Sequence, residues 1–469
     1  MYKKVLFSFL LSSALITATT PIADFSGVYQ GTVNRIECPK DISELYTLVS
    51  NEKRISIAGG KYSMGGQIWC NNGVMIDMKH LNKVIAFDTV RKTVTVQTGM
   101  LWKDLQAFLQ PHNFTVKVMQ SYNDFSVGGS LSVNVHGRDP YSPLINTVES
   151  ITVMLSDGSI VRANRTEHTD LFNAAIGGYG SCGIIIDATL QLEDNYKIKQ
   201  SVTVVDVQDF KNFYDNTIAN NPQVAFFNGN LYGPTFDKVV NFTWYKTDAP
   251  LTQNKPIFPS TRSFAHGAKT NFLTYSVAST AEYLMGEFAS IQQSRFKVDA
   301  KEGKKSPVIL RADEMNYTVK SLATRTLRTT KILQEYFIPV RHFTHFVNGF
   351  KKIIQEHDIK ILNLSIRHVP RHNESILTYA PQDCFAFVCY ISIKNNPQGH
   401  EQTQIWTEKV IDLALSLRGT YYLPYHLFAT QDQFKRAYPR YNELLQVKRR
   451  YDPLGKFQNK LLESFTQGK

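Results

Sequence analysis

Three clusters of paired glycines carry the clearest chemical signal in the sequence. They read AGGKYSMGG at residues 58–66, SVGGS at 126–130 and GGYGSCG at 177–183. Glycine permits positive φ and a close approach of a ligand to the backbone, and consecutive free N–H groups in such turns bind phosphate oxygens. One glycine pair is usually only a turn, but three clusters in one region favour a ligand that contains a pyrophosphate.

Two common phosphate-binding motifs do not fit these clusters. Gly178-x-Gly180-x-x-Gly183 has the spacing of the nicotinamide-dinucleotide fingerprint, but it precedes a predicted strand instead of lying between a strand and a helix. The P-loop signature G-K-[ST] does not occur in the sequence. The pyrophosphate ligand must therefore be held by another kind of fold.

Short strands and helices alternate in the first third of the chain and must position the clusters. Asp41 and Glu44 are spaced as a capping box ahead of a helix. Asp157-Gly158 indicates a hairpin between two apolar runs. The pattern predicts strands at 54–58, 84–87, 93–97, 151–155, 160–163 and 184–192, and a helix at 102–109.

From about residue 196 the connections lengthen and paired glycines become rare. The pattern predicts strands at 336–339, 359–366 and 385–393, and helices at 346–354, 434–437 and 441–450. We therefore expect two α+β domains with a boundary near residue 195, and a C-terminal segment that packs back on the first domain.

The order of the glycine clusters resembles the FAD-binding domain of the vanillyl-alcohol-oxidase (PCMH-type) flavoproteins. The resemblance rests on AGGKYSMGG, VGGSLSVNVHGRD and GGYGSCGIIIDATL, and on FKRAYPRYNELLQVKRRYDPLGKFQN near the C-terminus. Within that superfamily the chain is similar to the sugar-oxidising branch of aldonolactone and alditol oxidases and decaprenylphosphoryl-ribose oxidase. The resemblance implies an α+β fold with a two-subdomain FAD-binding domain at 34–195, a substrate (cap) domain at 196–425, and C-terminal helices at 426–469 that return to the FAD domain.

The resemblance also implies which residues contact FAD. The backbone of the first cluster would hold the pyrophosphate, the second cluster and the stretch after it would line the cofactor from the other side, and the third would meet the adenine end. The implied cofactor-binding residues are Gly59, Gly60, Lys61, Tyr62, Ser63, Ser121, Ser126, Val127, Gly128, Gly129, Ser130, Val133, Asn134, His136, Gly183, Ile184, Ile185 and Tyr422.

Tyr62 departs from the pattern of this branch. Many relatives carry a histidine at this position that attaches FAD covalently, and a phenol cannot form the histidyl linkage. Decaprenylphosphoryl-ribose oxidases also have tyrosine there. We therefore expect FAD to be bound non-covalently.

Three polar residues are candidates for the oxidation of an alcohol, which needs a base for the hydroxyl proton while hydride leaves to flavin N5. His136 follows the second cluster and either contacts flavin or substrate or is a packed histidine. Glu335 begins EYFIP, which resembles an active-site strand of the alditol and lactone oxidases; the alternative is a solvated strand end. Arg367 in LSIRHVP aligns with a basic active-site residue and could bind substrate oxygens or stabilise reduced flavin.

A lysine that relatives place near the flavin is missing. The corresponding stretch reads Leu423-Pro424-Tyr425-His426-Leu427 and places Tyr425 at the lysine position with His426 beside it. Either side chain could hydrogen-bond the flavin. Both are therefore candidates for the catalytic site, and activity towards the relatives' own substrates is an open point.

Composition and cysteine usage limit the function classes. The hydrophobic share of 43% allows a large core, and the net charge of +12 is spread along the chain without a nucleic-acid-binding motif. Five scattered cysteines without a CxxC pair predict neither a disulfide framework nor a metal site. We expect no nucleic-acid partner.

The N-terminus has the layout of a secretory signal. Lys3 and Lys4 precede an apolar stretch from Val5 to Ala18, which is shorter than a comfortable membrane span. Residues 1–20 are predicted to be a signal peptide or an N-terminal anchor. The protein would then be exported, to the periplasm or the medium, or be membrane-anchored.

Three functions are compatible with the sequence. The first is an FAD-linked oxidoreductase that acts on the CH–OH group of a sugar-like alcohol or aldonolactone, with oxygen or a quinone as the electron acceptor. The second is a lipid-linked sugar oxidase at a membrane, which the basic charge and the N-terminal segment favour. The third is a flavin-binding protein without catalysis, which the missing lysine keeps open.

Overall fold

Two sheets build the N-terminal domain in the computed structural model, which describes residues 19–253, 296–297, 299–300, 306–319 and 328–466. A parallel sheet has the order β3-β5-β4, and a larger sheet has the order β10-β9-β11-β7-β6 with β8 paired to β11. The strands are β3 (Arg35–Glu37), β4 (Ile55–Ala58), β5 (Val74–Asp77), β6 (Val84–Asp88), β7 (Thr93–Gln97), β8 (Phe114–Val116), β9 (Val148–Met154), β10 (Ile160–Asn164) and β11 (Ile184–Asp194). The helices are α1 (Ile42–Asn51), α2 (Trp102–Leu109), α3 (Val127–Ser132) and α4 (Thr169–Ala175).

The predicted elements of this domain are confirmed. The Asp41 side chain caps α1 by accepting a hydrogen bond from the Glu44 N–H at 2.9 Å. The contact differs from a standard capping box in one respect: the Glu44 carboxylate accepts a hydrogen bond from the N–H of Lys40, at 2.8 Å, and not from the N–H of the cap residue Asp41. β9 and β10 pair antiparallel on either side of Asp157-Gly158, as the turn residues predicted.

An eight-stranded antiparallel sheet follows, with the order β15-β12-β14-β13-β17-β18-β16-β19. Its strands are β12 (Lys197–Asp206), β13 (Val224–Leu231), β14 (Lys238–Lys246), β15 (Val308–Leu310), β16 (Thr329–Pro339), β17 (Lys360–Val369), β18 (Cys384–Lys394) and β19 (Thr420–Tyr421). The helices are α5 (Phe210–Phe213), α8 (Phe343–Glu356) and α9 (Pro397–Ser416). The predicted strand at 336–339 is only the end of β16, whose polar residues at 329–335 hid its length.

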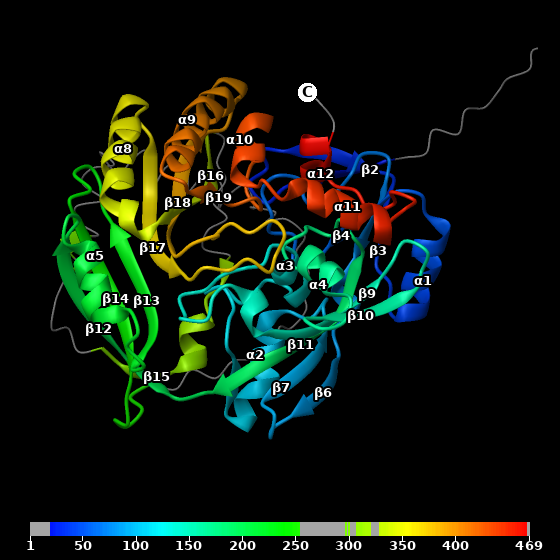
Figure 1. The fold of residues 1–469 in the computed structure, drawn as a ribbon, viewed down its shortest axis with the longest axis horizontal. Helices are drawn as coiled ribbons and strands as arrows, with labels where there is room; N and C mark the ends of the chain where they lie inside the picture. Colours follow the sequence, from blue (N-terminus) through cyan, green and yellow to red (C-terminus); the bar gives the residue numbers. More distant parts are fainter. Residues whose placement is uncertain (1–18, 254–295, 298, 301–305, 320–327, 467–469) are drawn as a thin grey trace, which may run out of the picture.

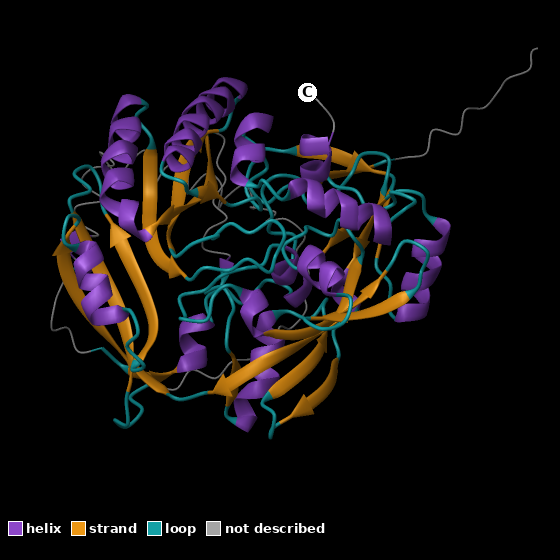
Figure 2. Ribbon diagram, viewed as in Figure 1, coloured by secondary structure: helices purple, strands orange, loops and turns teal. Residues whose placement is uncertain are grey.

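Strand alternation gives this sheet two different faces. Phe387 on β18 faces α8, where its ring lies 4.6 Å from that of Phe346, and Ile366 on β17 is fully buried on the same side. Helices α8 and α9 stand against this outer face, while the inner face looks towards the loops of the N-terminal domain (Figures 1 and 2). The inner face is therefore free to carry polar residues.

The C-terminal segment returns to the N-terminal domain, as the resemblance implied. Its helices are α10 (Gln431–Ala437), α11 (Tyr441–Tyr451) and α12 (Lys460–Thr466), and the last two lie beside β4 (Figure 1). The Ile55 N–H donates to the Lys456 carbonyl at 2.7 Å, and the Gln458 N–H donates to the Ile55 carbonyl at 2.8 Å. These bonds attach the last helices to the strand that carries the first glycine cluster.

A hairpin of β1 (Thr20–Ala23) and β2 (Gln30–Val33) begins the described chain. Residues 1–18 of the predicted signal or anchor lie outside the described residues. Within the part of the chain that the structure describes, none of the helices combines the length and the apolar character that a membrane crossing requires.

Candidate active site

A cavity of about 560 Å³ separates the glycine clusters from the inner face of the large sheet. Its size is typical of ligand sites in proteins. It is lined by most of the predicted site residues: Gly59, Gly60, Lys61, Tyr62, Ser63, Ser121, Ser126, Gly128, Gly129, Ser130, Val133, His136, Gly183, Ile185, Glu335, Arg367, Tyr422 and Tyr425. The glycine clusters of the N-terminal domain and residues of the large sheet, such as Glu335 and Arg367, thus line the same cavity.

The first two glycine clusters interlock at one end of the cavity. Ser126 is the N-cap of α3, and its Oγ accepts hydrogen bonds from the N–H groups of Gly60 and Gly129, each at 3.2 Å. A Cβ on Gly59 would lie 2.0 Å from this Oγ, so only glycine fits there. Lys61 has a φ of 63°, and its Nζ pairs with Asp77 at 2.7 Å. The turn is therefore fixed in a shape that presents its backbone to the cavity.

The lining of this end fits the cofactor that the resemblance implies. Ser63 Oγ is buried and has no hydrogen-bond partner among the described residues. Gly183, at the start of β11, has a φ of 155°, and the Cβ of any larger residue there would lie 2.5 Å from Val153. An orphaned hydroxyl and a backbone cradle that side chains cannot fill match a pyrophosphate-containing ligand such as FAD.

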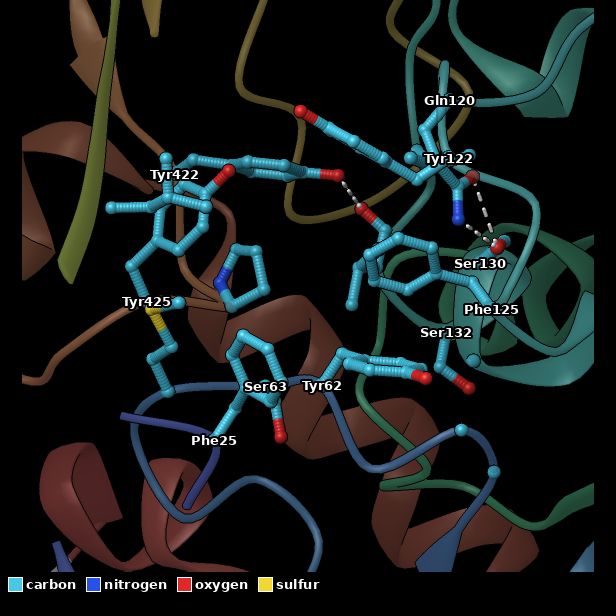
Figure 3. Close-up of a pocket in the computed structure, with 18 of the residues that line it drawn as sticks. Phe25, Tyr62, Ser63, Gln120, Tyr122, Phe125, Ser130, Ser132, Tyr422 and Tyr425 are labelled. Carbon is cyan, nitrogen blue, oxygen red and sulfur yellow. Dashed lines mark hydrogen bonds between the residues drawn. The ribbon is translucent and has the colours of Figure 1, made fainter. Parts of the chain in front are cut away.

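Aromatic rings surround Tyr62 (Figure 3). Its ring lies 5.2 Å from that of Phe25 and 4.8 Å from that of Phe125, and all three line the cavity. Burial, and then the charge of Asp124, raise the pKa of Tyr62 to about 12. The phenol is thus packed as a neutral aromatic group.

A buried carboxylate joins the two domains across the cavity. Glu335 on β16 has one oxygen bonded to His136 Nε2 and the other to the Tyr425 hydroxyl at 3.1 Å. Glu335 and His136 are each 2% exposed, so Glu335 is no solvated strand end. His136 Nδ1 is buried and has no hydrogen-bond partner among the described residues. The pair can therefore hold a proton acceptor at Nδ1, with the carboxylate fixing the other nitrogen as a donor.

Arg367 lies two strands from Glu335 on the same face of the sheet. Val388 on β18 lines the cavity between them, and Ile366 and His368 point away into the outer side. The Arg367 Nε has no hydrogen-bond partner among the described residues. Burial, and then the nearby charge of Arg138, lower the pKa of Arg367. A buried guanidinium whose Nε has no protein partner among the described residues is suited to bind ligand oxygens.

Tyr422 and Tyr425 enter the cavity from the loop after β19. The Tyr422 hydroxyl donates to the Val133 carbonyl at 2.9 Å, next to the second glycine cluster. Burial, and then the charge of Glu335, raise the pKa of Tyr425 well above its usual value. Both phenols therefore remain hydrogen-bond donors at neutral pH.

His426 does not line the cavity, so the structure does not bring it together with the other candidate catalytic residues. Its Nε2 lies 2.9 Å from Ser26 Oγ, which also donates to Asp24 Oδ1 at 2.8 Å. Consecutive residues point to different sides here, so the inward orientation of Tyr425 turns His426 towards the β1–β2 hairpin. We call Asp24, Ser26 and His426 the hairpin tie.

Three predicted cofactor residues also lie outside the cavity. Val127 and Ile184 are fully buried in apolar clusters. The Asn134 side chain accepts from the Ile145 N–H at 2.9 Å and lies 3.2 Å from His372 Nε2. These side chains support the glycine loops from behind.

Several lining residues carried no sequence signal. Phe25, Tyr122, Asn228 and Asn230 line the cavity. Phe25 lies in a turn with no motif, and the two asparagines sit at alternate positions of an ordinary strand. Only the period-2 spacing of Asn228 and Asn230 could have placed them on one face. No group of three potential metal-ligating side chains occurs among the described residues.

Comparison with known proteins agrees with this geometry. A model described as FAD binding domain matches residues 33–164, and a model described as D-arabinono-1,4-lactone oxidase matches residues 188–465. L-gulonolactone oxidase of Bos taurus is 22% identical over 430 residues, which cover 90% of this chain and 92% of that protein. L-galactono-1,4-lactone dehydrogenase of Arabidopsis thaliana is 26% identical over 47% of this chain, and D-arabinono-1,4-lactone oxidase of Yarrowia lipolytica is 25% identical over 46%.

The plant and yeast matches span 36% and 42% of those relatives. The D-arabinono-1,4-lactone oxidase model, in contrast, matches more than half of the present chain. Together with the FAD-binding domain around the glycine clusters, this match assigns the oxidoreductase class and the cofactor. The chain belongs to the D-arabinono-1,4-lactone oxidase family and is an FAD-binding oxidoreductase of the PCMH type.

Proposed function

We propose that the protein oxidises a CH–OH group of an aldonolactone or a related sugar-like alcohol. The observation that carries this proposal is the His136–Glu335–Tyr425 cluster, which lines the cavity where the N-terminal domain meets the large sheet. When bound, FAD supplies a hydride acceptor at N5. The names and coverage of the relatives support the sugar-lactone class of substrate.

The chain's own residues then divide the remaining work. His136 Nδ1 accepts the proton of the substrate hydroxyl, and Glu335 keeps Nε2 as the protonated nitrogen and stabilises the resulting imidazolium. Tyr425 holds the second carboxylate oxygen. Arg367 binds a substrate oxygen on the adjoining part of the wall.

Anaerobic reductive titration tests the proposal. A panel of aldonolactones, alditols and sugar phosphates is added to the flavin-loaded protein while the absorbance at about 450 nm is followed, a wavelength set by the flavin itself. We expect bleaching by an aldonolactone or alditol. Bleaching by sugar phosphates alone would instead favour a phosphate-bearing sugar, and no bleaching by any compound would favour a flavin-binding protein without catalysis.

We further propose that FAD is bound without a covalent bond and that oxygen or a quinone reoxidises it. The packing of Tyr62 between Phe25 and Phe125 supports a non-covalent site. After acid precipitation the flavin is expected in the supernatant, and flavin in the protein pellet would contradict the proposal. Reoxidation rates with oxygen and with a soluble quinone assign the acceptor.

A further inference from the structure

A row of cavity-lining residues runs straight across four strands of the large sheet. Glu335 on β16, Val388 on β18, Ser365 on β17 and Asn230 on β13 are successive register partners. Neighbouring strands lie about 4.8 Å apart, so the row extends about 14 Å from the carboxylate. The cavity wall therefore continues well beyond the His136–Glu335 pair.

The far part of this wall is a network of neutral polar side chains. The amide of Asn228 donates to Asn230 Oδ1 at 2.9 Å, and the Ser365 hydroxyl donates to the same oxygen at 3.1 Å. The amide of Asn363 donates to Ser365 Oγ at 2.9 Å. These bonds fix the orientation of the amides before any ligand binds.

Asn228 carries an acceptor that none of the described residues uses. The residue is 4% exposed and lines the cavity, and its Oδ1 has no hydrogen-bond partner among the residues that the structure describes. A buried carbonyl oxygen without a donor is unfavourable unless a ligand completes it. Gly229 pairs with Ile366, so Asn228 lies beside Arg367 on the neighbouring strand.

The chemistry of this patch selects hydroxyl groups. An amide both donates and accepts, as a hydroxyl does, and carries no charge itself. The charge beside the patch is that of the Arg367 guanidinium, which can donate to a hydroxyl oxygen as well. On the side towards Glu335 the wall becomes apolar at Leu333 and Val388. A ligand that suits both parts has hydroxyls at one end and a C–H-rich face at the other.

We propose that Asn228, oriented by Asn230 and with Asn363 and Ser365 beside it, forms a hydroxyl-binding subsite that determines substrate specificity. This inference rests on the proposed function and names its substrate class. The substrate is a polyhydroxylated compound that reaches from the His136–Glu335 pair to β13. A bare lactone ring occupies only the first part of the wall.

Binding across a series of ligand lengths tests the subsite without relying on turnover. Dissociation constants are measured by calorimetry on the flavin-loaded protein for glycerol, erythritol, xylitol, sorbitol and D-arabinono-1,4-lactone. In the wild type we expect affinity to rise with alditol length. In Asn228→Leu, and in Asn228→Ala as a smaller change, the longest alditols lose about tenfold in affinity while glycerol is unaffected.

Asn241 provides a matched control. It is a fully buried asparagine of the adjoining strand β14 whose Oδ1 also has no hydrogen-bond partner among the described residues, but it does not line the cavity. Asn241→Leu should keep the wild-type length dependence.

The outcomes separate the two proposals. The subsite is overturned if affinity depends on alditol length equally in the wild type and in both Asn228 variants. It is also overturned if Asn241→Leu loses as much affinity for the longest alditols as Asn228→Leu. Both conclusions hold even if the flavin is reduced. Binding that depends on Asn228 without flavin reduction by any of these ligands upholds the subsite and contradicts the proposed oxidation.

Discussion

Within the described part of the chain, two buried clusters each pair a histidine with a carboxylate, and they differ in their position relative to the cavity. His136 and Glu335 line the cavity. In both His136 and His426 the Nδ1 atom has no hydrogen-bond partner among the described residues, so this feature is common to the two clusters. His426 in the hairpin tie lies 3.8 Å from Asp24 and 2.9 Å from Ser26, away from the cavity. Composition does not distinguish a catalytic pair from a structural one; access to a ligand does.

The electrostatics of the tie fit a structural role. Burial raises the pKa of Asp24 to about 7, although hydrogen bonds from Ser26 and three backbone N–H groups oppose this shift. Burial, and then the charge of His400, lower the pKa of His426 to about 3. His426 is therefore neutral at pH 7 and Asp24 is less ionised than an exposed carboxyl, which suits a contact that attaches the β1–β2 hairpin to the C-terminal loop.

The largest expected effect is on the rate of flavin reduction, when the carboxylate of each cluster is replaced by an amide and the two variants are compared. In Glu335→Gln the amide can donate to His136 Nε2, which moves the imidazole proton to Nδ1 and removes the base. We expect the rate of flavin reduction to fall about 100-fold or more, as measured by anaerobic stopped-flow absorbance. Asp24→Asn should leave this rate within about twofold of the wild type. Equal losses in both variants would contradict the distinction.

Arg367→Met tests whether the guanidinium beside the His136–Glu335 pair binds substrate. The variant keeps the length of the side chain and removes the guanidinium. A charge-assisted hydrogen bond contributes about 1.5–3 kcal/mol, so kcat/KM should fall by about 10- to 150-fold. Most of the loss is expected in KM. A variant with unchanged kcat/KM would remove Arg367 from the substrate site.

The hairpin tie predicts opposite pH dependences for its two members. Asp24 binds its proton more tightly in the folded state, so its contribution to stability is present below about pH 4 and lost as pH rises to about 7. His426 binds its proton more weakly in the folded state, so its contribution is present above about pH 6.5 and lost as pH falls to about 3. Between about pH 4 and 6.5 the two slopes oppose each other.

Removing one member should expose the slope of the other. The stability of Asp24→Asn should fall as pH drops from about 6.5 to 3, and that of His426→Gln should fall as pH rises from about 4 to 7, each on the order of 4 kcal/mol. Urea unfolding at several pH values measures both. Slopes of the same sign in the two variants would contradict this account of the tie.

Tyr425→Phe has the smallest expected effect. It removes one neutral-donor bond to Glu335 and leaves His136 in place. The flavin reduction rate should fall by about tenfold or less, since such a bond contributes about 0.5–1.5 kcal/mol. A loss as large as that of Glu335→Gln would make the phenol, and not the imidazole, the essential partner of the carboxylate.

Sequence reasoning identified those residues of the site that stand in a recognisable local pattern. The glycine clusters indicated the end of the cavity that is expected to hold the cofactor. Gly59 follows a strand and Ser126 caps a helix, and glycine and serine are the residue types typical of these two positions. Glu335 and Arg367 were candidates because each lies in a stretch that resembles a family motif, and both line the cavity; their catalytic roles stay predictions. Periodicity predicted the α+β elements of both domains, and the family resemblance implied their assignment to an FAD-binding domain and a substrate domain.

The remainder depends on tertiary contacts that leave no local pattern. Nothing in its own neighbourhood predicts that Phe25 packs on Tyr62, or that Asn228 lies beside Arg367. His426 was expected at the cavity, but its neighbour in sequence points there instead, and no periodicity in that loop states which side chain turns inward. Side-chain direction in loops is set by packing that only the folded chain contains.

The paired histidine variants His136→Gln and His426→Gln test the central claim most directly. Both are assayed for FAD content and for the rate of anaerobic flavin reduction by the best substrate of the panel. The account predicts normal FAD content in both, a rate about 100-fold or more below the wild type for His136→Gln, and a near-normal rate for His426→Gln. A near-normal rate for His136→Gln with full FAD content would contradict it.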